Sequence, residues 1–139
     1  YPADALSKLA TQLVLKRVDA GTVLVVQGTE PREFVLLMRG QCEVRRSPEP
    51  SRYNKLDGVT TAIYELEDAL HVGTLWRGDT FDPESVLSGK EHTYFVITKT
   101  MCDILQLSTV ELTKFFDPPL MEKFKARAPT FVSGEELVK

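Results

Sequence analysis

The side chains that most often do chemistry in proteins are sparse and scattered in this sequence. It contains two histidines, His71 and His92, and two cysteines, Cys42 and Cys102, and each stands apart from the others along the chain. A histidine-based metal site on a β-barrel would need a His-x-His pair together with a third histidine and a carboxylate. The sequence therefore predicts no metal site, no resident cofactor and no enzyme.

Charged residues gather in a few short runs. Acidic runs occur at 82–85 ("DPES") and 65–68 ("ELED"), and a basic cluster combines Arg45-Arg46 with Arg52 and Lys55. Acidic residues beside Pro and Ser are typical of helix starts and solvated faces, so we do not expect a general acid/base pair. We interpret the basic cluster as the solvated end of a hairpin and its loop.

The two cysteines lie in apolar stretches, which predicts reduced core thiols of a cytoplasmic protein rather than a disulfide or a metal pair. In "CDILQLS" at 102–108, the alternation puts Cys102, Ile104 and Gln106 on one face of a strand. We therefore predict that Cys102 is buried and unpaired. Trp76 closes another strand-like segment and is predicted to be a core residue.

The bulk composition is that of an ordinary globular domain. The chain has 139 residues, of which 42% are hydrophobic and 27% charged, with a net charge of −3. The acidic balance argues against a nucleic-acid surface, and no apolar run approaches the roughly 18 residues of a membrane span. Because the chain starts at Tyr1, we predict one domain over residues 1–139 of a longer protein, acting with its other domains or a protein partner.

Hydrophobic periodicity predicts the elements. Residues 3–13 carry leucines at helical spacing. Arg39-Gly40-Gln41 is predicted to be a tight hairpin turn. Ser108 and Glu111 form a capping box, and Asp117-Pro118 begin a second helix. Strands are expected at 13–19, 20–30, 33–46, 59–67, 70–76, 93–99 and 102–108. One helix, about eight short strands and then helices predict a mainly β sandwich or jelly-roll barrel.

The order and spacing of these segments resemble a cyclic nucleotide-binding domain. The resemblance covers nearly the whole chain and is carried by "LKRVDAGTVLVVQGTEPREFVLLMRGQCEVRR", "LWRGDTFDPESVLSGKEHTYFVITKTMCDILQLS" and the capped helix that follows. It implies an eight-stranded jelly roll with an N-terminal helix and C-terminal helices. In members that bind ligand, a phosphate-binding cassette runs Phe-Gly-Glu, two or three apolar residues, and Pro-Arg-Ala-Ala. Its Glu takes the ribose hydroxyl, and its Arg and helix amides take the cyclic phosphate.

The resemblance places this cassette at residues 81–94. Without gaps, the family's Glu falls on Pro83 and its Arg on His92. A shift by one residue would restore the Glu as Glu84, but no shift supplies an Arg. The candidate ligand-binding residues are Phe81, Asp82, Pro83, Glu84, Ser85, His92, Thr93 and Tyr94.

These departures weaken anion binding for three physical reasons. Losing one partner of a buried charged pair costs about 2–5 kcal/mol, and His92 lacks the forked geometry of a guanidinium. Asp82 is a favourable N-cap, Pro83 has no amide hydrogen and Glu84 lies in the first turn, so the helix start is already neutralised. Tyr94 replaces a small residue and crowds the site.

The sequence therefore predicts a non-catalytic regulatory or protein-interaction module that does not bind cAMP or cGMP through the usual cassette. The alternative is a sensor whose pocket has been rebuilt for a cyclic nucleotide or another small molecule and that controls an attached effector or channel. A related question is what fills the pocket. Some channel relatives of the family fill theirs with a residue of their own tail. Phe131 either packs outside the helices or folds back against Tyr94 and Val86.

Overall fold

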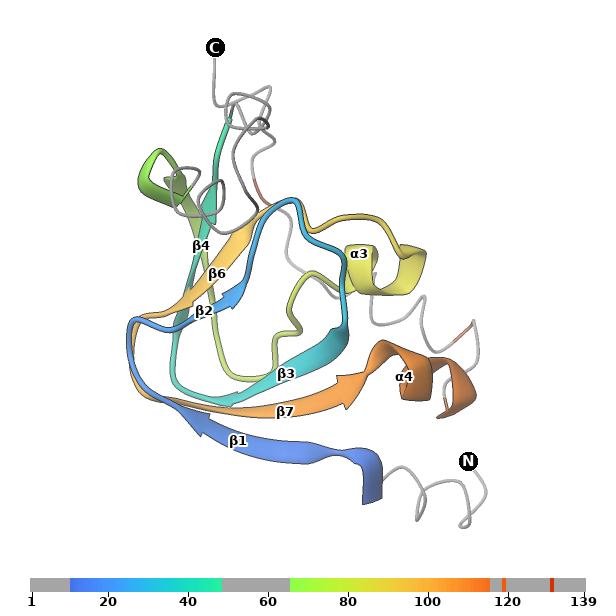
Figure 1. Cartoon of the computed structure of the whole chain (residues 1–139). Helices are drawn as coiled ribbons and strands as arrows, with labels where there is room; N and C mark the ends of the chain where they lie inside the picture. Colours follow the sequence, from blue (N-terminus) through green and yellow to red (C-terminus); the bar gives the residue numbers. More distant parts are fainter. Residues whose placement is uncertain (1–10, 49–65, 116–118, 120–130, 132–139) are drawn as a thin grey trace.

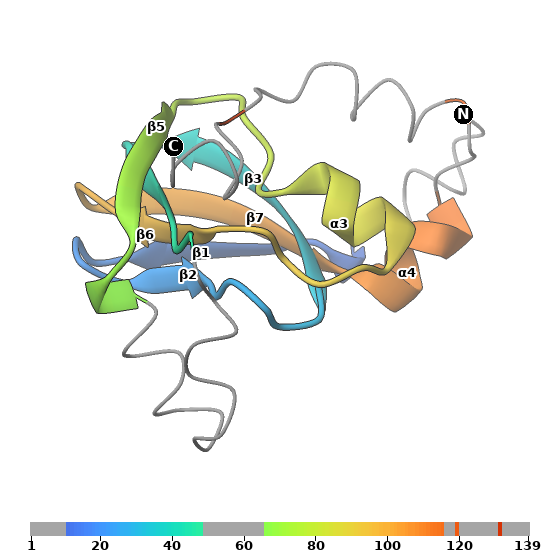
Figure 2. The same ribbon diagram turned by 90° about the horizontal axis from the view of Figure 1, so that it is seen from above.

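The strands form two antiparallel sheets that enclose a common core (Figure 1 and Figure 2). The computed structural model describes residues 11–48, 66–115, 119 and 131. One sheet has the strand order β1-β7-β3 and the other β2-β6-β4-β5. The strands are β1 (Val14–Val18), β2 (Val23–Val25), β3 (Glu33–Arg39), β4 (Cys42–Arg46), β5 (Leu70–Leu75), β6 (Phe95–Thr98) and β7 (Cys102–Ser108), and the helices are α3 (Pro83–Ser88) and α4 (Thr109–Phe115).

This arrangement matches the mainly β, jelly-roll-like fold that the sequence predicts. Seven strands lie in the described part of the chain. The strand predicted at 59–67 falls outside the described residues except at Leu66 and Glu67, which form a helical turn. The predicted helix at 3–13 and the second cap at Asp117-Pro118 also fall almost wholly outside them. Within the described residues, no helix is long and apolar enough to cross a membrane.

The core lies between the two sheets because alternate residues of each strand point into the same space. Leu37 and Ile104 of the first sheet are fully buried, and so are Val44 and Val96 of the second. The alternation predicted for β7 is confirmed, since Cys102 is buried together with Ile104. Cys102 is also a free thiol, as predicted.

The predicted hairpin at Arg39-Gly40-Gln41 is wrong, because the strands on either side of it belong to different sheets. β3 pairs with β7, whereas β4 pairs with β5 and β6. Gly40 instead forms a corner between the sheets. It has φ +97°, and a Cβ atom there would lie 2.5 Å from the Met101 carbonyl oxygen. Only glycine combines this backbone angle with so close an approach.

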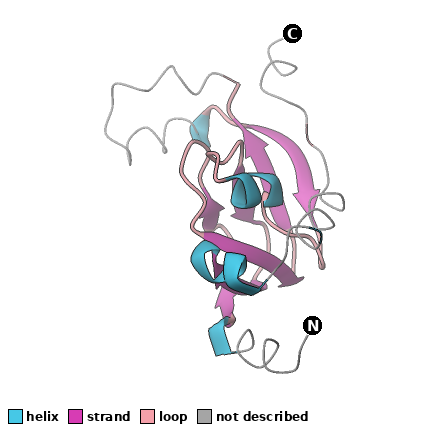
Figure 3. Cartoon of the chain, turned by 90° about the vertical axis from the view of Figure 1, so that its right-hand side faces the viewer, coloured by secondary structure: helices cyan, strands magenta, loops and turns pink. Residues whose placement is uncertain are grey.

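Both helices lie on one side of the barrel, in front of the strands in Figure 3. There they cover a second apolar cluster of Phe34, Val86, Leu107 and Leu112. The Glu111 amide donates to Ser108 Oγ at 3.2 Å, which confirms Ser108 as the cap of α4. α3 packs against β3 and lies within the predicted cassette.

Candidate ligand-binding site

The cassette residues occupy the loop and helix that lead from β5 to β6. Phe81 is 1% exposed and belongs to the barrel core. α3 follows, and Ser85 Oγ donates to the Glu91 carbonyl at 3.1 Å, which ties the helix to the return segment. Glu84 is exposed and faces away from these contacts. The fold thus brings residues 82, 92 and 93 together, although they are separated in sequence.

Asp82 and His92 form a buried pair at the centre of the cassette. His92 Nδ1 lies 2.9 Å from Asp82 Oδ2, and their side chains are 9% and 5% exposed. The Thr93 amide donates to the same oxygen at 3.3 Å. His92, which the resemblance in sequence aligns with the family's Arg, is therefore bonded to a carboxylate of the chain itself.

Asp82 also departs from its predicted role as a helix cap. It stands before α3, but its side chain makes no capping hydrogen bond. Among the described residues other than glycine, only Asp82 has a positive φ, at 45°. This left-handed conformation costs about 1–2 kcal/mol for an L-residue, and Asp tolerates it better than most. The two bonds to His92 and Thr93 offset that cost.

Arg46 is the functional candidate that the sequence prediction missed. It was expected at a solvated hairpin end, yet it is 9% exposed. Its Nε donates to the Thr93 carbonyl at 3.0 Å, its Nη1 donates to the Phe131 carbonyl at 3.3 Å, and its guanidinium lies 5.8 Å from the centre of the Tyr94 ring. The alternation of β4 contains the missing signal, because Cys42, Val44 and Arg46 all point inward.

Phe131 packs against the barrel beside the cassette. Its ring meets the Tyr94 ring edge-on, with centroids 5.3 Å apart and an interplanar angle of 79°. It also occupies the space next to Gly73 in β5, where an added Cβ would lie 2.3 Å from the Phe131 ring. The contact with Tyr94 agrees with the hypothesis that the tail folds back. Val86 is different, because it belongs to the cluster under the helices.

The surroundings of Tyr94 keep its phenol neutral. Burial raises the pKa of Tyr94 above its ordinary value, and the nearby Asp82 charge raises that pKa further. The neutral ring is therefore an apolar and polarisable wall for Phe131 and Arg46. Tyr94 contacts Arg46 and Phe131, and that it crowds a ligand site stays a prediction.

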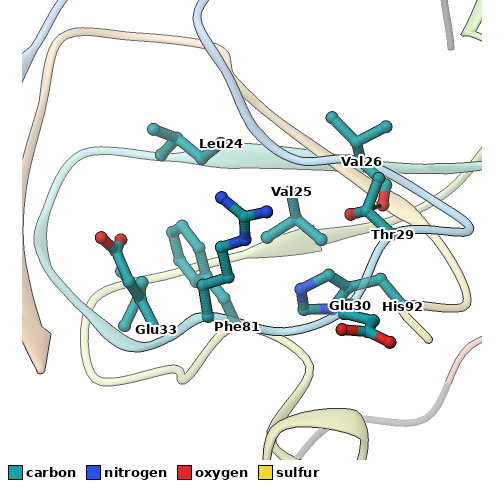
Figure 4. Close-up of a pocket in the computed structure, with 10 residues that line it drawn as sticks. Leu24, Val25, Val26, Thr29, Glu30, Glu33, Phe81 and His92 are labelled. Carbon is teal, nitrogen blue, oxygen red and sulfur yellow. Dashed lines mark hydrogen bonds between the residues drawn. The ribbon is translucent and has the colours of Figure 1, made fainter. Parts of the chain in front are cut away.

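A separate hollow of about 550 Å³ opens between residues 24–35 and the cassette (Figure 4). It shares only Phe81 and His92 with the cassette, and Arg46, Tyr94 and Phe131 do not line it. In Figure 4, His92 and Glu30 lie toward one end and Glu33 toward the other. Two short backbone hydrogen bonds, from the Gly28 amide to the His92 carbonyl and from the His92 amide to the Thr29 carbonyl, join the hollow to the cassette.

Other candidate groups are placed away from this region. His71 lies exposed on β5, where it pairs in register with Arg45. Trp76 follows the end of β5 and is 55% exposed, so its predicted place in the core is wrong. Within the described residues, no group of three or more His, Cys, Asp and Glu side chains could hold a metal ion.

Comparison with known proteins finds similarity in structure and not in sequence. No family model and no curated protein matches the sequence. Solved structures similar to this chain include the regulatory subunit of a cAMP-independent protein kinase A from Trypanosoma brucei (15% identity, TM-score 0.68, 90% of this chain and 38% of that chain). Another is the regulatory domain of Toxoplasma gondii PKA with cAMP (15% identity, TM-score 0.65, 91% of this chain and 41% of that chain). A third is the Thermus thermophilus catabolite activator protein (15% identity, TM-score 0.62, 90% of this chain and 52% of that chain).

These similarities show that the chain has the fold of the cyclic nucleotide-binding domains, which the resemblance in sequence had implied. The chain spans about half or less of the length of those structures. At 15% identity the match concerns the fold alone, so activity and ligand must be argued from the residues of this site.

Proposed function

We propose that the chain is a non-catalytic regulatory module of cyclic nucleotide-binding type whose cassette does not bind cAMP or cGMP in the usual way. The observation that carries the proposal is the buried Asp82–His92 pair. Asp82 places a carboxylate where a cyclic phosphate would need donors. This carboxylate is already hydrogen-bonded to the His92 ring and to the Thr93 amide. An incoming phosphate would have to break both bonds and approach a negative charge.

The start of α3 offers a phosphate few free amide donors and little positive charge. Pro83 has no amide hydrogen, and the Val86 amide already donates to the Asp82 carbonyl at 3.1 Å. Glu84 adds a negative charge in the first turn of α3. The usual attraction of a helix N-terminus for anions is therefore weak at this site.

Phe131 supports a further part of the proposal, namely that the chain fills the space beside its own cassette. The Phe131 ring contacts Tyr94 and lies over Gly73, and its carbonyl accepts a hydrogen bond from Arg46. A built-in aromatic group held in this way would compete with any ligand for the same surface. We propose that displacement of this segment, by another domain or by a protein partner, is the regulatory event.

One observation favours the second candidate, a sensor with a rebuilt pocket. Arg46 brings a buried guanidinium within hydrogen-bond distance of the cassette residue Thr93. If the segment at Phe131 moved away, Arg46 would present donors that could meet a phosphate. The two candidates thus differ in whether Arg46 serves the chain itself or an external anion.

Titration of cAMP and cGMP decides between them. A ligand at one hundred times its Kd adds about 2.7 kcal/mol, which raises Tm by a few degrees for a domain of this size. We expect no rise in Tm at millimolar nucleotide. A positive control restores the family residues (Asp82→Gly, Pro83→Glu, His92→Arg) together with Phe131→Ala, and this variant should gain a dose-dependent rise. A rise in the unaltered chain that Arg46→Met abolishes would establish the rebuilt sensor instead.

A further inference from the structure

The hollow between residues 24–35 and the cassette has the size and lining of a small-molecule site. Its volume of about 550 Å³ falls within the roughly 300–1,000 Å³ typical of ligand pockets. Its floor is apolar and is formed by Leu24, Val25, Val35 and Phe81. Three of these side chains are at most 6% exposed, so they are fixed by the core and form a rigid surface.

The rim of the hollow carries more negative than positive charge. Two acidic side chains, Glu30 and Glu33, and one basic side chain, Arg32, line the hollow. Glu33 already accepts a hydrogen bond from Gln106 Nε2 at 2.7 Å. Glu30 is exposed and makes no side-chain hydrogen bond or ion pair with another described residue, so its carboxylate is available to a ligand. This balance favours a ligand that brings a positive charge.

His92 supplies the buried polar anchor. Nδ1 is taken up by Asp82, and when the ring carries its single proton there, Nε2 is a hydrogen-bond acceptor. No described residue lies within hydrogen-bond distance of Nε2, although the side chain is only 9% exposed and lines the hollow. None of the buried side-chain N and O atoms among the described residues lacks a hydrogen-bond partner, so Nε2 is not fully buried and is open to a ligand with an N–H donor.

We propose that this hollow binds a small primary amine with an apolar body. The body lies on the Leu24, Val35 and Phe81 floor, while the ammonium group donates to His92 Nε2 and faces Glu30. The proposal does not require the cassette to bind a cyclic nucleotide, although the hollow shares Phe81 and His92 with it. His92 is also bonded to Asp82 and to the Gly28 and Thr29 backbone, so the bound amine would stabilise these contacts of the cassette.

Two probes with the same ring and opposite charge test the proposal on the full chain. Tryptamine carries an ammonium group and indole-3-acetate a carboxylate. Calorimetry should show saturable binding of tryptamine and at least tenfold weaker binding of indole-3-acetate. Glu30→Gln should weaken tryptamine by about twofold to fivefold, as for an exposed ion pair, whereas Glu67→Gln, at an exposed residue outside the hollow, should have no effect.

Leu24→Trp fills the hollow from a partly buried position and should abolish tryptamine binding. NMR on the unaltered chain provides a second measurement in case this variant does not fold. Tryptamine should shift the amides of residues 24–33 and the His92 ring nitrogens, and leave the Arg46 and Gly73 amides unchanged. Equal or tighter binding of indole-3-acetate, shifts centred on Gly73, or no saturable binding of tryptamine would each overturn the proposal.

Discussion

Two hydrogen-bonded side-chain pairs of equal length lie in opposite environments of this domain. Asp82 and His92 approach to 2.9 Å with side chains 5% and 9% exposed, whereas Asp103 and Arg17 approach to the same 2.9 Å with side chains 20% and 65% exposed. The buried pair joins the start of the cassette to its return segment before β6, and the exposed pair joins β7 to β1 on the surface. The comparison shows that equal distances do not mean equal contributions to stability, because burial determines how much free energy is lost when a pair is broken.

Breaking the buried pair is expected to have the largest effect. Asp82→Ala leaves His92 and the Thr93 amide without their partner and puts a residue that disfavours positive φ at φ 45°. We expect the free energy of unfolding to fall by about 3–5 kcal/mol. Chemical denaturation measures this loss. Asp82→Asn is the matched control, since it retains an acceptor and tolerates the same backbone, and it should lose less than Ala. Equal losses would show that the carboxylate pairing is unimportant.

The contact at Phe131 should come next. Phe131→Ala removes a partly buried ring from Tyr94 and Gly73, and we expect a loss of about 2–3 kcal/mol. Truncation after Ala128 should cause a similar loss and create a site for an apolar dye. If thermal stability and dye binding stay unchanged in the truncated chain, the tail does not fill this space.

Gly73 sharpens the same prediction. Gly73→Ala places a Cβ where the Phe131 ring lies, and overpacking of this kind costs about 1–3 kcal/mol. Combined with Phe131→Ala, the added methyl group should cost much less, because its obstacle has been removed. A double-mutant cycle of denaturation measurements gives the coupling between the two sites. Additive losses would contradict direct packing of Phe131 on Gly73.

The exposed pair should give the smallest effect. The hydrogen bond from Arg17 lowers the pKa of Asp103 below its ordinary value. The stability that Asp103 contributes is thus present above the ordinary Asp range and is lost as the pH falls through its lowered folded pKa. Arg17→Gln should weaken this acid-limb dependence, to which Arg39 also contributes, and change neutral stability only slightly. Salt should diminish the effect, as measured by denaturation at several pH values, whereas the Asp82→Ala loss should hardly respond to salt.

The sequence alone correctly predicted features that depend on residues close together in the chain. β7 has the bounds that its alternation predicts, Cys102 is buried, and Ser108 caps α4. These features depend on residues two to four positions apart, so hydrophobic alternation and helix-capping residues predict them directly. The absence of an Arg from residues 81–94 can also be read directly from the sequence, whereas the assignment of these residues as a cassette stays a prediction.

Only the tertiary structure decided which groups meet. Periodicity shows that Arg46 points to one face of β4, but not that Thr93 and Phe131 supply carbonyl oxygens there. It cannot show that Asp82 turns from capping α3 to holding His92, since that choice depends on a return segment ten residues away. Gly40 signals a turn, yet the sheet to which each neighbouring strand goes is set by long-range pairing. Sequence encodes the faces of the elements, and contacts between distant segments decide what each face touches.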